Sequence, residues 1–177
     1  MDASAASTAL AAVASTAVFE GVALFVAVGD PCPSYADQSQ DATEMLRDWR
    51  RMFPAAKAFQ MKALVLGSAA AAITAWGLRD SNPQAAAAFG IAVAANVATV
   101  GYTVGSIEPL NNRMLPLGAV EKRETEEGIR GMLQQASVIS NSTSQGSWSK
   151  MHGLRTVLGA VALGASLYGT HTLLTSK

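Results

Sequence analysis

Four long stretches of the sequence are built almost entirely from apolar and small side chains. They are residues 3–29, 63–78, 84–107 and 156–176. The only Asp, Glu, Lys, Arg or His residues within them are Glu20 and His171. A helix rises about 1.5 Å per residue, so a helix over residues 84–107 is about 36 Å long, which is enough to cross a bilayer. The pattern predicts four transmembrane helices, at about residues 5–29, 58–78, 84–107 and 153–174.

A soluble bundle with alanine-rich buried helices is the weaker interpretation. A helix on the surface of a soluble protein needs a polar face, whereas these stretches are apolar or small all round. We therefore expect an all-α protein, a four-helix transmembrane bundle that forms a single domain over residues 1–177. Four crossings place the loops 30–57 and 108–152 on the same side of the membrane.

The cations indicate which side that is. Eleven of the 13 Lys and Arg residues lie in or beside these two loops, and only Arg79 and Lys177 lie at the opposite ends of the spans. Loops rich in Lys and Arg stay on the cytoplasmic side or its organellar equivalent. The multi-pass protein should therefore have both termini on the non-cytoplasmic side. The sequence does not indicate an organelle.

Composition excludes several classes of function. The 13 basic residues are balanced by 13 acidic ones, which argues against a nucleic-acid partner. The single cysteine, Cys32, cannot form an internal disulfide or a CxxC motif. His152 and His171 lie at opposite ends of one span, so no cluster has the spacing of metal ligands. The sequence predicts no metal and no other cofactor, and a lipid or pigment bound between the helices is compatible with it.

Each long loop is expected to carry a short amphipathic helix at the membrane interface. In the first loop, residues 41–44 match a capping box and the run ends at Pro54, which should break the helix. Its apolar face consists of Met45, Trp49, Met52 and Phe53. In the second loop, residues 129–136 repeat apolar positions at helical spacing after a group of acidic residues.

Small residues four positions apart recur in the last two spans. The pairs are Gly101 with Gly105, Ala160 with Gly164, and Ala165 with Gly169. Such pairs let helices in lipid approach closely. We favour packing among the four helices themselves, and the alternative is a docking face for another transmembrane subunit.

Polar residues inside the spans are the strongest site candidates. Glu20 and Asn96 lie about 14 and 17 Å from the cytoplasmic ends of their spans. An ionised carboxylate in hydrocarbon is unfavourable, so Glu20 should be protonated or should pair with Lys62, His152 or Arg155. One interpretation is a pocket for substrate or lipid that opens to the cytoplasmic face, with Glu20 and His152 as candidate catalytic groups. Its other predicted residues are Lys62, Asn96, Tyr102, Asn111 and Arg155.

The alternative interpretation of these residues is structural. Glu20 with a cationic partner would fix the register of the helices, and His152 beside Arg155 would anchor a span end at the interface. For Glu20 the two interpretations have equal weight, and for His152 and Arg155 the structural one is favoured.

The order of the motifs resembles that of the anthrone-oxygenase-like family of small four-helix membrane proteins, most of which have no assigned function. The resemblance rests on residues 102–103, 107–114 and 148–155. Pro109 and Asn111 occupy the places of the family's Pro-x-Asn signature. The resemblance implies a four-helix membrane fold over the whole chain.

The family also implies a chemistry. Its fungal members oxidise anthrones to anthraquinones without an added cofactor, and this activity is attributed to a histidine and an aspartate. In this chain no histidine precedes His152, and Asn112 occupies the position where the aspartate is expected. A neutral amide cannot act as a base. Proton removal would therefore have to use Glu20 or His152.

Two functional hypotheses follow. Because the expected catalytic pair is missing, we favour a noncatalytic membrane protein, an accessory subunit of a larger complex such as an organellar energy-transducing assembly, whose partners are lipid and other transmembrane subunits. The alternative is a cofactor-independent monooxygenase that acts on a lipophilic aromatic substrate. A transporter or channel ranks third, since the sequence has no inverted repeat or charged pore series.

Overall fold

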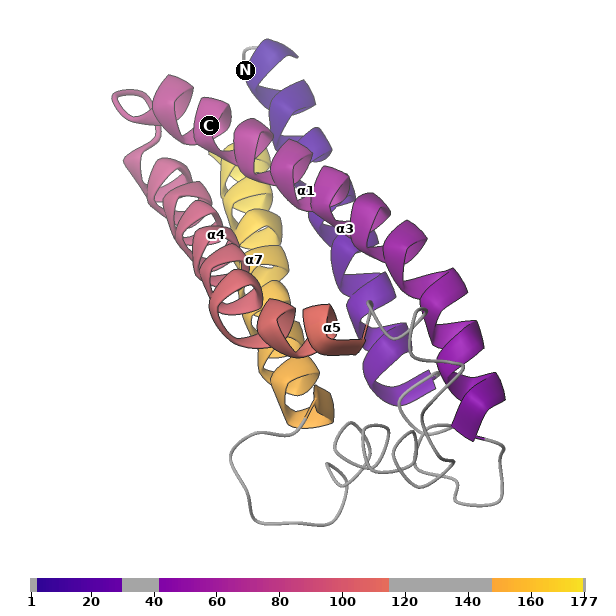
Figure 1. Cartoon of the computed structure of the whole chain (residues 1–177). Helices are drawn as coiled ribbons and strands as arrows, with labels where there is room; N and C mark the ends of the chain where they lie inside the picture. The colour runs from indigo at the N-terminus through magenta and orange to yellow at the C-terminus, as the bar shows by residue number, and fades with distance from the viewer. Residues whose placement is uncertain (1–2, 30–41, 115–147, 177) are drawn as a thin grey trace.

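The structure is a computed structural model that describes residues 3–29, 42–114 and 148–176. The protein is all-helical in these ranges. Helix α1 spans Ala3–Leu24 and continues as the π-helical turn η1, Phe25–Gly29. Helix α3 spans Ala42–Leu78, and α4 spans Pro83–Tyr102. The π-helical turn η2, Thr103–Ile107, leads from α4 into the short α5, Glu108–Met114, and α7 spans Trp148–Thr175. The expected all-α architecture is confirmed (Figure 1).

Four of these segments are long and apolar enough to cross a membrane. They are Ala3–Ala27, Arg50–Leu78, Pro83–Ile107 and Met151–Thr175. Large apolar side chains such as Leu66, Trp76 and Val97 are exposed on the outside of the bundle. A soluble monomer rarely exposes so much apolar surface, whereas lipid requires it. The chain is therefore a multi-pass membrane protein, as its charge-free stretches predict.

The helices run up and down, so both termini lie at one end of the bundle (Figure 1). The tight connection between α3 and α4 lies at this same end. Asn82 caps α4, because its side-chain oxygen accepts a hydrogen bond of 3.1 Å from the backbone N–H of Ala85, and Pro83 occupies the first helical position. The opposite end is formed by η1, α5 and the first turns of α3 and α7 (Figure 1).

Helix α3 corrects one prediction. Pro54 does not separate an interfacial helix from the second span, because a single helix runs through it from Ala42 to Leu78. A proline inside a helix removes one backbone hydrogen bond and favours a kink, but it does not force the chain to stop when both flanks are otherwise helical. The second expected interfacial helix, over residues 129–136, lies outside the described residues.

Close packing inside the bundle depends on alanine and on a few glycines. Gly67 on α3 faces α1, where a Cβ atom on residue 67 would lie 3.0 Å from Thr16 Oγ1. Gly169 on α7 faces α4, where a Cβ atom would lie 2.9 Å from the ring of Phe89. These two glycines allow neighbouring helices to approach more closely than any other residue would permit.

Most residues of the predicted small-residue pairs do not lie at contacts between the helices. Of the five packing positions, Gly169 is buried against α4, whereas Gly101, Gly105, Ala160 and Gly164 are exposed on the outside of the bundle. A Cβ atom on any of these three exposed glycines would meet no atom within 4 Å. The expectation of packing among the four helices is therefore corrected for the four exposed positions.

Candidate functional site

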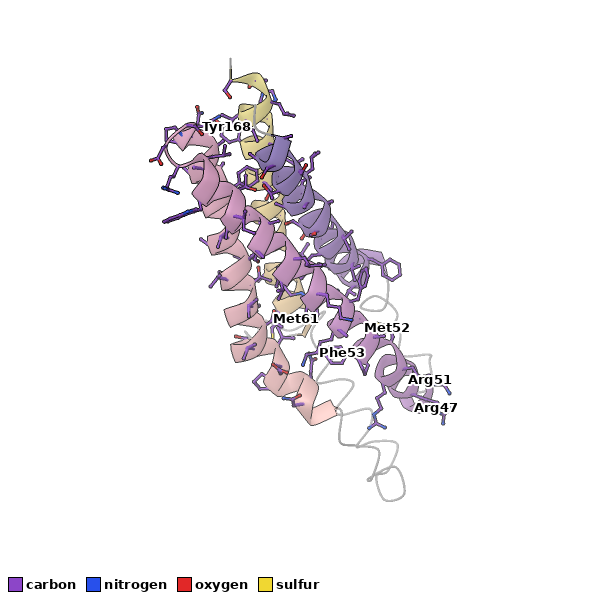
Figure 2. All side chains as sticks on the ribbon, turned by 90° about the horizontal axis from the view of Figure 1, so that it is seen from above. Arg47, Arg51, Met52, Phe53, Met61 and Tyr168 are labelled. Atoms are coloured by element: carbon purple, nitrogen blue, oxygen red, sulfur yellow. The ribbon has the colours of Figure 1, made fainter. Side chains whose placement is uncertain are left out.

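A cavity lies at the end of the bundle opposite the termini. The space between its walls is about 620 Å³ when the open solvent at its mouth is included, and its enclosed part is about 40 Å³. Its apolar walls come from α1, η1, α3 and η2, and they are Phe19, Val26, Met52, Phe53, Ala56, Met61, Leu64 and Ile107. Figure 2 shows Phe53 and Met61 on the flank of α3 that faces α4, whereas Arg47 and Arg51 lie near the free end of α3.

Both π-helical turns contribute to this cavity. Val26 comes from η1, and Thr103 and Ile107 come from η2. A π-helical turn inserts an extra residue into a helix and rotates the side chains that follow, and such turns are frequent at functional sites. After η2, α5 crosses the end of the bundle (Figure 1), which places the buried side chain of Asn111 in the cavity wall.

An ion pair joins two walls of the cavity. Lys57 on α3 donates a hydrogen bond to a carboxylate oxygen of Glu108, the first residue of α5. Both side chains are partly exposed and both line the cavity. The pair thus ties α5 to α3 beside the opening.

The buried polar groups of the cavity come mainly from the start of α7. His152 and Arg155 are three residues apart and so lie on one face of the helix. Both line the cavity, and their exposed fractions are only 3% and 7%. The guanidinium carbon of Arg155 lies 5.8 Å from the centre of the Phe19 ring on α1. Gln60 of α3 adds a further buried amide to the lining.

The predicted site residues are only partly brought together. Asn111, His152 and Arg155 line the cavity. Glu20 and Asn96 are buried deeper in the bundle and do not belong to its lining. Tyr102 is half-buried and also lies outside the lining.

The prediction for Lys62 is corrected. Lys62 is exposed and lines a separate, shallow hollow between α1 and α3 on the outside of the bundle. It shares this outward face of α3 with Phe59 and Leu66, which are also exposed. Glu20 is not beside Lys62, because its carboxyl group lies against Gly159 of α7.

Comparisons with known proteins identify the family. Residues 49–165 match the family described as anthrone oxygenase. This chain belongs to the anthrone oxygenase family. It is 28% identical over 130 residues to the anthrone oxygenase encC of Aspergillus fumigatus, and the match covers 70% of this chain and 71% of that protein. No solved structure matches it.

The region shared with the anthrone oxygenase family contains most of the cavity. It includes the lining residues of α3, η2, α5 and α7, but it begins after α1. Phe19, Val26 and Glu20 therefore lie outside the matched residues. The resemblance noted from residues 102–103, 107–114 and 148–155 is confirmed at the level of the family.

Helix α3 contributes cavity residues that the sequence pattern alone does not single out. Phe53, Lys57, Gln60 and Leu64 all line the cavity. They recur at intervals of three and four residues, which is the signature of one helical face. The signal was present in the sequence, but it becomes visible only when the helix is continued through Pro54.

The lining combines apolar side chains with a few polar groups. Aromatic and thioether side chains offer an apolar surface to a flat ring system. Arg155 and Asn111 supply hydrogen-bond donors for a carbonyl oxygen, and His152 can accept or donate a proton. Within the described ranges, no three His, Cys, Asp or Glu side chains lie close enough to hold a metal ion.

Proposed function

We propose that this protein is a membrane oxygenase that uses dioxygen to oxidise an anthrone-type ketone to a quinone. The observation that carries the proposal is the burial of His152 and Arg155 side by side in an apolar cavity of an anthrone oxygenase family member. The relative encC is itself named an anthrone oxygenase. These findings favour the enzyme over the noncatalytic accessory subunit that the sequence alone favours.

The overall reaction needs no oxidant other than dioxygen. An anthrone has a methylene carbon between two aromatic rings and opposite a ketone. In the net reaction, both methylene hydrogens and one oxygen atom of dioxygen leave as water, and the second oxygen atom becomes a new carbonyl. The methylene carbon loses four electrons, and dioxygen gains the same four.

In this scheme His152 is the base. It takes one methylene proton, and the electron pair of the broken C–H bond is delocalised onto the ketone oxygen. Arg155 and Asn111 donate hydrogen bonds to that oxygen, where negative charge develops. A histidine suits the role because its neutral imidazole has a ring nitrogen that can accept a proton.

The remaining steps return the proton to oxygen. The substrate anion gives one electron to dioxygen, and the resulting radicals combine at the former methylene carbon with formation of a C–O bond. The peroxide receives the proton held on His152. Removal of the second C–H proton then expels the distal oxygen as hydroxide, the O–O bond breaks, and hydroxide takes up the proton to leave as water.

Oxygen uptake by the purified protein tests the proposal. In mild detergent, addition of an anthrone should cause dioxygen consumption and quinone formation in equal amounts, above the spontaneous rate in detergent alone. With ¹⁸O₂, mass spectrometry should find one labelled oxygen atom in each quinone. Uptake that does not exceed the spontaneous rate would contradict the proposed function.

We also propose that the cavity end of the bundle faces the cytoplasm or its organellar equivalent, as the bias of Lys and Arg indicates. The unique Cys32 lies in the sequence between η1 and α3 and can serve as the probe. A maleimide that does not cross membranes should label Cys32 only from that side. In a Cys32→Ser background, Ser81→Cys in the α3–α4 turn should be labelled only from the opposite side. Labelling of both positions from one side would refute the four-span topology.

A further inference from the structure

A buried carboxyl group lies directly behind the cavity. Glu20 is on α1, its exposed fraction is 4%, and the ring of its neighbour Phe19 lies beneath the guanidinium of Arg155. The Glu20 carboxyl group lies against Gly159 of α7, which follows Arg155 by about one helical turn on the same face of that helix. Two consecutive residues of α1 therefore lie against the part of α7 that carries Arg155.

The carboxyl group occupies a notch in α7 that exists because residue 159 is glycine. A Cβ atom on residue 159 would lie 2.1 Å from Glu20 Oε2 and 3.1 Å from Phe19 Cε1. The first distance is far below any real contact, so any other residue at position 159 must displace the carboxyl group. The other glycines of α7 do not share this role, since Gly153 and Gly164 have nothing within 4 Å of a Cβ atom and Gly169 faces Phe89 of α4.

Burial of the Glu20 carboxyl group lowers the stability of the bundle. Among the described residues, Glu20 Oε2 has no hydrogen-bond partner. A buried acceptor without a donor is destabilising, and a carboxylate within a membrane span is more so. A purely apolar residue at position 20 would fill an α1–α7 contact without either penalty, so the carboxyl group calls for a function.

The position of the Arg155 side chain suggests a function for Glu20. The helix that carries Arg155 begins at Trp148, so the long side chain starts about two turns from the helix end and could extend toward the headgroup region. It is instead buried against α1 and lines the inner wall of the cavity. A negative charge on the inner side of the guanidinium favours this inward position over the outward one.

We propose that Glu20 is a positioning residue, whose carboxylate holds the Arg155 guanidinium at the inner wall of the cavity so that Arg155 can bind a carbonyl oxygen of an aromatic ligand. The identity of the ligand rests on the proposed function, but the coupling of Glu20 to Arg155 does not. Because α1 precedes the residues matched by the family, Glu20 is not part of that match, whereas Arg155 and Gly159 lie within it.

Binding of two flat ligands to the full-length protein in detergent tests the proposal. 9,10-Anthraquinone has carbonyl oxygens, whereas anthracene has the same ring system without oxygen. Glu20→Gln and Arg155→Met should each weaken anthraquinone binding by about tenfold or more, as expected for loss of a hydrogen bond to a charged group. The double variant should bind anthraquinone no more weakly than Arg155→Met alone, because Glu20 acts only through Arg155. Binding of anthracene should change by less than about twofold.

The glycine notch provides a matched pair of variants. Gly159→Ala should reproduce the effect of Glu20→Gln on anthraquinone, because the added methyl group displaces the carboxyl group. Gly164→Ala, on an exposed position of the same helix, should bind both ligands as the unmodified protein does. Glu20→Asp, which retains the charge on a shorter side chain, should recover part of the anthraquinone affinity. If Glu20→Gln does not fold, Gly159→Ala and Glu20→Asp carry the same comparison.

Thermal unfolding without ligand tests the coupling separately. Glu20→Gln and Arg155→Met should shift the melting temperature non-additively in the double variant. Additive shifts, additive losses of anthraquinone affinity, or equal losses for anthracene would each overturn the proposal. Anthraquinone does not react, so the two proposals can fail separately. Coupling of Glu20 to Arg155 without oxygen uptake would count against the proposed function alone. Oxygen uptake without this coupling would count against the positioning role alone.

Discussion

Replacement of His152 by glutamine is expected to lower the rate of anthrone oxidation by a factor of about 10² to 10⁴. Glutamine has a similar size and can still donate a hydrogen bond, but it cannot take up the methylene proton. The loss should appear in kcat, because the proton is transferred in the chemical step and the ligand is held mainly by other groups. Initial rates of oxygen uptake at several anthrone concentrations measure the effect.

The chain contains a matched control, since its two histidines lie at opposite ends of α7. His171 is exposed at the end away from the cavity. His171→Gln should therefore retain the full rate, and both variants should show the same helix content by circular dichroism. If His152→Gln kept the full rate while oxidation itself was demonstrated, the base would have to be another group, and the assignment to His152 would be wrong.

The membrane spans could be predicted from the sequence because each contains a long run of residues with few or no charged side chains. Residues 84–107 contain no charged or histidine side chain over the length of a bilayer, and the observed span Pro83–Ile107 agrees with them almost residue for residue. A helix surrounded by lipid must be apolar on every side, so its length alone carries the information. Nothing about the contacts between helices is needed for this prediction.

The shape of the cavity end depends on features that have no such signature. The π-helical turns η1 and η2 follow ordinary helical sequence, and the rotation that they introduce depends on packing. Pro54 is also ambiguous, since proline ends many helices but only kinks others. As a result, the face of α3 that contributes Lys57 and Gln60 to the cavity was not foreseen.

The polar site was predictable in part because unfavourable residues stand out in a span. Glu20 stands out because burying a carboxyl group in a membrane is unfavourable, whereas the sequence favours an interfacial anchor for His152 and Arg155. Lys62 was assigned to the same group although it faces outward, because depth along a helix does not specify the direction of a side chain around it. The missing histidine–aspartate pair favoured a noncatalytic function, whereas the cavity and the family match favour an oxygenase.

A second large effect is expected in the core. Phe89 is fully buried, and the cluster around it consists largely of alanines such as Ala9, Ala12, Ala85 and Ala92. Phe89→Ala should lower the free energy of unfolding by about 3–5 kcal/mol. The effect should reach the upper end of this range, because alanine side chains are too short to move into the cavity that the ring would leave. Unfolding by increasing mole fractions of a denaturing detergent, followed by circular dichroism, provides the measurement.

Phe25→Ala is the control for this truncation, since Phe25 is 61% exposed on the outside of the bundle and should change stability by about 0.5 kcal/mol or less. Gly169 provides a sharper test, because a Cβ atom there would lie 2.9 Å from the Phe89 ring. Gly169→Leu should be destabilising alone, since the ring fills the same space. In combination with Phe89→Ala it should restore part of the lost stability, because a side chain from α7 would then occupy the space vacated on α4. If the two changes proved simply additive, the close contact between Gly169 and Phe89 would not be what holds α4 against α7.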